Sequence, residues 1–191
     1  DDSNDEVDWG NRYDTFTGKW EDAISLPDGA RFIGGAECDG FVYLFGGYDG
    51  SNLDTVLKVD VDRNAIASVT AMDTADLYIK AATVTSSADS TKAIYYAGQY
   101  HEDIKSFNPA TMTHSDFMDA PAGGDGRAYC LVTTNDGHNL FYLTSEALHK
   151  INVADKTSTK VADFSYGLYD SDSVNCALAS DGTFYIVQSS T

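Results

Sequence analysis

Three of the twelve basic residues of this chain recur at one position of a regular spacing. Arg31, Lys80 and Arg127 are 49 and 47 residues apart, and each stands at the start of an apolar run that predicts a strand. Basic side chains bind anionic groups through charge-assisted hydrogen bonds, and tyrosines are common at protein-binding surfaces. The nearby predicted loops carry Tyr48, Tyr78, Tyr100 and Tyr169. These seven residues are our candidate binding face for an anionic group or an acidic peptide.

The same three cations have a simpler interpretation, and it is the one that we prefer from the sequence. They would pair with acidic residues of the neighbouring loops and so hold adjacent parts of the fold together. The acids in question are Asp28, Asp76 and Asp125. A structure that places the three cations on different faces would exclude a shared binding role.

The remaining reactive residue types predict neither a catalytic site nor a metal site. The four histidines, His101, His114, His138 and His149, fall at four different places of the repeat described below, so they do not predict a shared metal. No Gly-X-Ser-X-Gly motif or phosphate-binding loop is present. Residues 1–8 are acidic enough for calcium, but Glu6 stands where an EF-hand loop needs glycine. We therefore expect no enzyme activity and no cofactor, with calcium as the weak alternative, and an acidic tail at residues 1–10.

Three cysteines allow at most one internal disulfide. Cys130 and Cys176 occupy equivalent positions of neighbouring predicted strands, whereas Cys38 lies beside a turn and looks unpaired. A disulfide requires Cα atoms within about 7 Å of each other. We expect small buried thiols at Cys130 and Cys176, with a disulfide between them as the alternative.

Composition limits the possible partners. The chain has 191 residues, with 30 acidic and 12 basic side chains and a formal charge of −18. This sign of charge argues against nucleic acid and anionic membranes as partners. No apolar run approaches the roughly 18 residues that a membrane-spanning helix needs. We expect a folded domain that neither inserts into a membrane nor binds nucleic acid.

The chain is organised as a repeat of about 45 to 50 residues. Four short aromatic or β-branched runs predict strands, at residues 41–47, 93–98, 140–144 and 184–187. Their tyrosines, Tyr43, Tyr95, Tyr142 and Tyr185, are 52, 47 and 43 residues apart. Each run follows a small, apolar segment and a turn that is rich in Asp, Gly, Asn or Ser. Each repeat therefore opens with an inner hairpin.

A second, outer hairpin follows each of the first three inner hairpins. Its equivalent residues are Val59, Phe107 and Ile151, and Tyr13 extends the series backwards at intervals of 46, 48 and 44 residues. The stretch 13–27 is thus a fourth outer hairpin, separated in sequence from the fourth inner hairpin at residues 173–190. Repeated four-stranded sheets without helical periodicity are typical of a β-propeller. We predict an all-β, four-bladed β-propeller whose last blade forms when the N-terminal outer strands pair with the C-terminal inner strands.

Several of these segments resemble the kelch repeat. The outer hairpin with Trp20, the strand that ends in Gly46-Gly47, and the turn Asn108-Pro109 are similar to kelch elements. The resemblance covers about residues 11–191, which we treat as a single domain. The glycine pair is complete only at Gly46-Gly47, and the tryptophan position is filled only by Trp20. The resemblance implies a propeller scaffold whose loops bind other proteins.

Taken together, these patterns predict a non-enzymatic β-propeller that serves as a protein-interaction or structural module in a larger assembly. Its partner would be another protein or a further copy of itself. The alternative is a secreted module that binds a carbohydrate or a divalent cation through the loops at one mouth of the propeller. We expect an extracellular or secreted location in either case.

Overall fold

The computed structural model describes residues 7–99, 102–123, 127–164, 168 and 174–188. The described chain is all-β, as expected, and none of it forms a helix that is long and apolar enough to cross a membrane. The strands are β1 (Val7–Asp14), β2 (Lys19–Ala30), β3 (Gly34–Cys38), β4 (Phe41–Phe45), β5 (Val56–Asp60), β6 (Ala65–Ser68), β7 (Lys80–Thr85), β8 (Lys92–Ala97), β9 (Asp103–Asn108), β10 (Thr113–Asp119), β11 (Cys130–Thr133), β12 (Asn139–Leu143), β13 (Ala147–Asn152), β14 (Thr157–Asp163), β15 (Val174–Leu178) and β16 (Phe184–Gln188).

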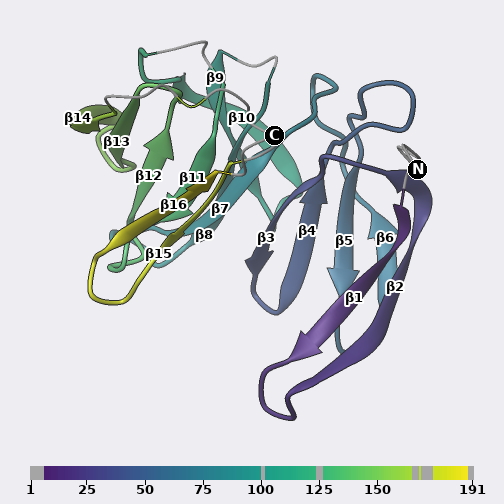
Figure 1. The fold of residues 1–191 in the computed structure, drawn as a ribbon. Coiled ribbons are helices and arrows are strands. Elements are labelled where there is room, and N and C mark those ends of the chain that lie inside the picture. Colours follow the sequence, from purple (N-terminus) through teal and green to yellow (C-terminus); the bar gives the residue numbers. More distant parts are fainter. Residues whose placement is uncertain (1–6, 100–101, 124–126, 165–167, 169–173, 189–191) are drawn as a thin grey trace.

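These strands form three complete sheets and two separate hairpins. Sheet 1 comprises β3–β6, sheet 2 comprises β7–β10 and sheet 3 comprises β11–β14, and in each the four strands pair in sequence order as an antiparallel meander. The N-terminal hairpin is β1–β2 and the C-terminal hairpin is β15–β16. The predicted succession of inner and outer hairpins is therefore confirmed. Figure 1 shows the sheets following one another in an arc, with the two hairpins at its opposite ends.

The first strands of consecutive units lie side by side: β3 beside β7, β7 beside β11, and β11 beside β15. An equivalent hydrogen bond joins the two strands at two of these junctions. The Thr83 hydroxyl donates to the carbonyl of Glu37 at 2.5 Å, and the Thr133 hydroxyl donates to the carbonyl of Thr83 at 2.6 Å. Consecutive sheets are therefore related by a repeated geometry around their inner strands.

Strand register confirms the repeat that the sequence predicts for the outer hairpins. The cross-strand pairs are Tyr13 with Trp20, Val59 with Ile66, Phe107 with His114, and Ile151 with Ser158. These are the aromatic series and the tryptophan position of the sequence analysis. The turn of the N-terminal hairpin is held by the Asp14 carboxylate, which accepts hydrogen bonds from the backbone N–H groups of Phe16 and Thr17 at 2.8 and 3.1 Å.

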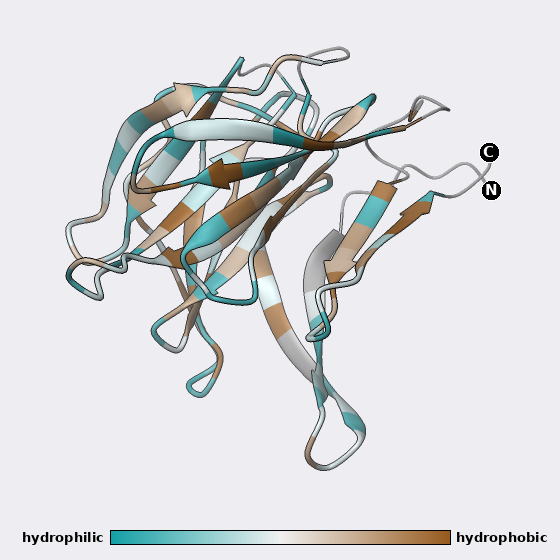
Figure 2. Cartoon of the chain, turned by 90° about the vertical axis from the view of Figure 1, so that its left-hand side faces the viewer, coloured by the Kyte–Doolittle hydropathy of each residue, from teal (hydrophilic) through white to brown (hydrophobic). Residues whose placement is uncertain are grey.

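Apolar side chains fill the spaces between consecutive sheets. Tyr43, Phe45 and Phe107 are among the buried residues between sheets 1 and 2, and two further clusters lie between sheets 2 and 3 and between sheet 3 and the C-terminal hairpin. Figure 2 shows this pattern, with apolar residues concentrated in the strands and polar residues in many of the turns. Because successive strand residues face opposite sides, each sheet packs on both its neighbours.

The predicted tyrosine series needs one correction. Tyr43 and Tyr95 face the following sheet, whereas Tyr142 belongs to the cluster shared with the preceding sheet 2. The residues of β12 that face the C-terminal hairpin are Phe141 and Leu143. Tyr142 is thus one residue out of register with the others, and in a strand a one-residue offset moves the side chain to the opposite face.

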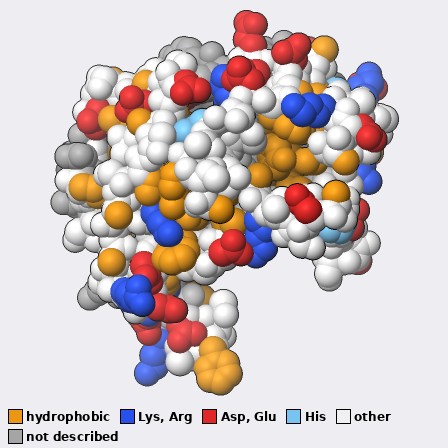
Figure 3. Space-filling view, turned by 180° about the vertical axis from the view of Figure 1, so that it is seen from behind, with side chains coloured by type: hydrophobic (Ala, Val, Ile, Leu, Met, Phe, Trp, Pro, Cys, Tyr) orange, Lys and Arg blue, Asp and Glu red, His pale blue; other side chains and the backbone are white. Residues whose placement is uncertain are grey.

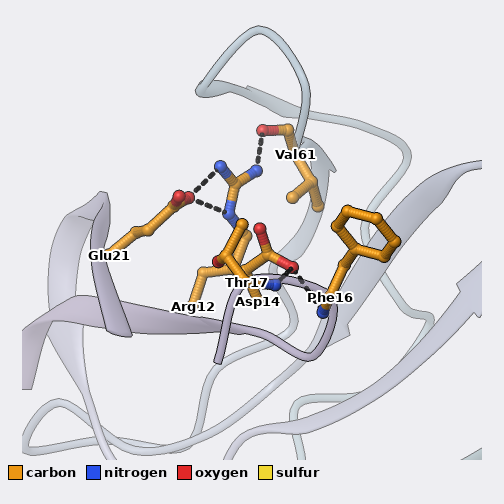
Figure 4. A network of polar contacts seen from close by, with 6 residues as sticks. All are labelled: Arg12, Asp14, Phe16, Thr17, Glu21 and Val61. Carbon is orange, nitrogen blue, oxygen red and sulfur yellow. Dashed lines mark hydrogen bonds and ion pairs between the residues drawn. The ribbon is translucent and has the colours of Figure 1, made fainter. Parts of the chain in front are cut away.

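The two terminal hairpins do not form the predicted closing blade. They are separate two-stranded sheets, each packed on the complete sheet at its own end of the arc. On the N-terminal hairpin, Arg12 forms an ion pair with Glu21 and donates to the carbonyl of Val61 at 3.0 Å, as Figure 4 shows. In addition, β1 begins at Val7, so residues 7–10 belong to a strand rather than to the expected acidic tail.

The cysteines also differ from the expectation. Cys130 of β11 and Cys176 of β15 form a disulfide across a Cα–Cα distance of 6.1 Å, so the prediction of buried thiols there is wrong. The side-by-side packing of the two inner strands brings the residues within disulfide reach. Cys38 is free and buried, as expected from its isolated position. The disulfide ties the C-terminal hairpin to sheet 3.

Candidate binding site

The loops that precede sheets 1 and 2 bring part of the predicted binding face together. Arg31 and Tyr48 form an isolated antiparallel bridge, in which each backbone N–H donates to the other residue's carbonyl at 3.0 and 2.9 Å. This backbone pairing places the Arg31 guanidinium over the Tyr48 ring, with the central carbon 4.8 Å from the ring centroid. The same carbon lies 5.3 Å from the centroid of Phe32. Two aromatic rings therefore position the cation.

Arg31 makes no ion pair or hydrogen bond through its side chain within the described part of the chain. Its Nε atom is buried and lacks a hydrogen-bond partner there, although the residue as a whole is only half-buried. The loop-acid pairing that we preferred from the sequence is thus not seen for Arg31. A guanidinium has five N–H donors, and a buried donor without a partner lowers stability. The Arg31 side chain therefore has donor capacity that the described residues do not use.

Phe32, which contacts the cation, is joined to Tyr78 of the loop before sheet 2. Both have positive φ, 62° and 55°, which is rare for bulky side chains and strains the backbone. The loops are joined by a hydrogen bond from the Tyr78 N–H to the Phe32 carbonyl at 3.0 Å, and the two rings lie 4.2 Å apart. Strained backbone of this kind is concentrated at functional sites. Phe32 was missed in the sequence analysis, although its position directly after Arg31 was visible there.

Asp76 anchors the loop that carries Tyr78. It is fully buried, and its carboxylate accepts hydrogen bonds from the backbone N–H groups of Leu77 and Gln99 at 2.7 and 3.1 Å. Its own carbonyl accepts from the N–H of Gly47 at 2.9 Å. These contacts join Asp76 to backbone groups, and its ion pair with a ring cation stays a prediction. These hydrogen bonds fix the backbone beside Tyr78, whose ring packs on Phe32. We call the rings of Phe32, Tyr48 and Tyr78 the aromatic platform.

Gly98 has no side chain, and the Asp76 carboxylate occupies the space that a Cβ atom there would fill. This contact leads to a stability prediction. A Cβ atom at Gly98 would lie 2.1 Å from an oxygen of Asp76. We expect Gly98→Ala to lower the free energy of unfolding by about 1–3 kcal/mol, because the buried carboxylate would be displaced from its donors. Urea denaturation measures this loss. Gly10→Ala in β1, where a Cβ meets nothing within 4 Å, is the matched control and should change stability by less than about 1 kcal/mol. Equal effects of the two substitutions would contradict the role given to Gly98.

The other predicted site residues are only partly accounted for. Lys80 begins β7 and Arg127 precedes β11, and both side chains are half-buried and take part in interactions. Tyr100 and Tyr169 lie outside the described residues, as does Asp125. On the face seen in Figure 3, basic side chains are dispersed among acidic and apolar ones. The described site therefore centres on Arg31, Phe32, Tyr48 and Tyr78 rather than on a ring of cations.

Histidines serve as structural hydrogen-bonding groups where their contacts are described. His114 contacts the Tyr96 hydroxyl at 2.9 Å and the Thr70 carbonyl at 3.0 Å, and His138 contacts the Thr85 carbonyl at 2.7 Å. Within the described residues, no group of three or more His, Cys, Asp or Glu side chains is placed to hold a metal ion.

Comparison with known proteins gives the fold its class. No family model and no curated protein matches the chain. Solved structures do match, among them the structure of YjhT, with a TM-score of 0.66 and 15% sequence identity over 85% of this chain. YjhT has a β-propeller-like fold. The fold of this chain is propeller-like. Sheets 1, 2 and 3 are four-stranded antiparallel sheets like the blades of a propeller, and their first strands, with β15, lie side by side. The chain spans 60% of the length of YjhT.

Proposed function

We propose that this chain is a non-enzymatic, kelch-like β-propeller module that binds a protein partner through the loops around Arg31. The observation that carries the proposal is the state of Arg31 itself. It is held over Tyr48 and Phe32, and it has no ionic partner within the described part of a chain that contains 30 acidic residues. A cation that served only to balance local charge would be expected beside one of those acids.

The ligand that fits this site is a single carboxylate next to an apolar side chain. The guanidinium would donate charge-assisted hydrogen bonds to the carboxylate. The rings of Phe32, Tyr48 and Tyr78 would contact the apolar neighbour, as aromatic anchors do at protein interfaces. A polyacidic tract is disfavoured because the chain carries a formal charge of −18 and would repel it.

An extracellular or secreted location is part of the proposal. The Cys130–Cys176 disulfide supports it, because structural disulfides persist mainly in oxidising compartments. The kelch assignment is supported by the repeated register of the outer hairpins. It is also supported by Gly46 and Gly47, which follow β4 directly and both have positive φ.

A titration with matched dipeptides tests the binding site. We expect N-acetyl-Asp-Phe-amide to shift the NMR signals of the Arg31 side chain and of the loop amides around Tyr48 and Tyr78. N-acetyl-Asn-Phe-amide, which lacks the charge, should bind roughly 10- to 150-fold more weakly, in line with a charged hydrogen bond of about 1.5–3 kcal/mol. Arg31→Gln should remove the preference for the charged peptide.

The control for this experiment is Arg63→Gln. Arg63 is exposed and pairs with Asp60 at 3.4 Å in the turn between β5 and β6, so its loss should leave binding unchanged. If the two peptides bind the wild-type chain equally, or if Arg31→Gln retains the preference, Arg31 is not the anion-binding group and the proposal fails.

A further inference from the structure

The N-terminal hairpin exposes Tyr13, at a repeat position that every complete sheet buries. In the outer-hairpin series, Val59, Phe107 and Ile151 are 3%, 0% and 0% exposed, whereas Tyr13 is 49% exposed. Its cross-strand partner Trp20 is 71% exposed. Phe107 and Ile151 belong to the clusters shared with the preceding sheet. Tyr13 and Trp20 have no preceding sheet to cover them within the described chain.

The C-terminal hairpin shows the reverse situation. On the second inner strands, Tyr43, Tyr95 and Leu143 face the following unit and are 1%, 9% and 0% exposed. The corresponding face of β16 carries Tyr185 and Val187, which are 56% and 65% exposed. Phe184 and Ile186, on the other face of β16, pack against sheet 3. The arc thus ends in an uncovered apolar face that in the other units receives a following sheet.

A cavity of about 460 Å³ lies where that face would fit. It is bounded on one side by β1 and β2 and on the other by the face of sheet 1 that points toward the N-terminal hairpin; its apolar lining is Ile24, Leu26, Val42, Leu44, Val59 and Val61. In this molecule, second inner strands of consecutive units stack on each other, as Phe45 stacks on Tyr96 with ring centroids 5.0 Å apart. Val42 and Leu44 of β4 are therefore placed to receive the second strand of a preceding inner hairpin.

We propose that the C-terminal hairpin of one copy of this chain fills this cavity in a second copy. β16 then pairs with the free edge of β1, and Tyr185 and Val187 pack on Val42 and Leu44 of the second copy. Inner and outer hairpins from two chains complete one four-stranded blade. Each copy offers one hairpin and one cavity, so two copies close a ring through two identical joints.

Two observations favour a second copy over closure within one chain. The C-terminal hairpin is bound to sheet 3 by the Cys130–Cys176 disulfide and by apolar packing, and it forms a sheet separate from the N-terminal hairpin. The N-terminal hairpin is held at sheet 1 by Arg12 and its contact with the Val61 carbonyl (Figure 4). The inserted strands, VNCAL and FYIVQ, carry no charged side chain, and the charged residues of the cavity lining are Arg12, which pairs with Glu21, and Asp62.

Sedimentation velocity of the full chain tests this association. We expect a dimer that becomes stronger between 0.05 and 0.5 M NaCl, because salt screens the repulsion between two chains of charge −18. Val187→Lys should weaken dimerisation at least about tenfold, since it buries an unpaired charge in the joint. Because Val187 is exposed in the single chain, this substitution should leave the melting temperature of the monomer unchanged.

The matched control is Phe16→Lys, at the tip of the N-terminal hairpin, where the side chain is 97% exposed and away from the cavity. It should dimerise like the parent chain. Hydrogen exchange should show amides of β1 and β16 becoming protected together as the protein concentration rises. A monomer at all concentrations, with or without protected β16 amides, would overturn the proposal. So would a dimer that Val187→Lys leaves intact.

Discussion

Breaking the Cys130–Cys176 disulfide should lower the free energy of unfolding by about 3–4 kcal/mol. The bond joins residues that are 46 positions apart, and in the chain-entropy model a loop of this size contributes about 4 kcal/mol by restricting the unfolded chain. The bond also links β11 to β15, so its loss should release the C-terminal hairpin from sheet 3 before the other sheets unfold. Urea denaturation with and without reductant measures the change, and hydrogen exchange locates it.

The double variant Cys130→Ala/Cys176→Ala is the control, and its stability should not respond to reductant. Thiol counting gives an independent check. Burial raises the pKa of the Cys38 thiol to about 11, so this cysteine should not react in the folded protein at pH 8. We expect no reactive thiol in the folded protein, one after unfolding without reductant, and three after unfolding with it. A parent chain that is equally stable with reductant would show that the disulfide is not a stabilising link.

Truncating Phe107 should cost about 3–5 kcal/mol, whereas truncating Tyr13 at the equivalent repeat position should cost less than about 1 kcal/mol in the monomer. Phe107 is fully buried between sheets 1 and 2, where its ring lies 5.4 Å from that of Tyr43 and 5.7 Å from that of Phe45. Its removal leaves a cavity that the sheets cannot easily close. The rings of Tyr13 and Trp20 lie 5.1 Å apart, centroid to centroid, on an exposed surface. Removing the Tyr13 ring therefore loses little buried apolar area.

Comparing Phe107→Ala with Tyr13→Ala in dilute solution separates repeat position from burial, because each variant is the other's control. Urea denaturation at a concentration well below that of any self-association gives both values. Equal losses would mean that the N-terminal hairpin is covered by another part of the chain, in conflict with its exposed position. A small loss for Phe107→Ala would show that the space between sheets 1 and 2 is not a packed core.

Much of the fold was predictable from the sequence because its information is local and periodic. Alternating apolar strands joined by short polar turns determine hairpins, and their spacing determines a repeat. The pairs Tyr13–Trp20 and Val59–Ile66 follow from this spacing and are confirmed by strand register. The exception is Tyr142. Aligning the strands by their tyrosines cannot detect a one-residue offset, yet that offset decides which neighbouring sheet a side chain meets.

The binding site was predictable only in part. Arg31 was correctly placed ahead of an inner strand, but its predicted equivalence with Lys80 is wrong, because Lys80 begins β7 and aligns in register with Gly34. The contacts there depend on which loops meet, which no spacing reveals. The backbone pairing of Arg31 with Tyr48 and the ring contact of Phe32 with Tyr78 make the aromatic platform. The same tertiary pairing gives Asp76 backbone partners from Leu77 and Gln99.

By itself, the sequence determined an all-β chain of repeated hairpins, because strand periodicity and turn chemistry act over a few residues. Only the tertiary structure decided which side chains from distant repeats meet. It brought Cys130 within 6.1 Å of Cys176, since that distance depends on how two inner strands pack. It also left the two terminal hairpins apart, because the angles between consecutive sheets add up along the whole arc and are set by side-chain packing at every junction.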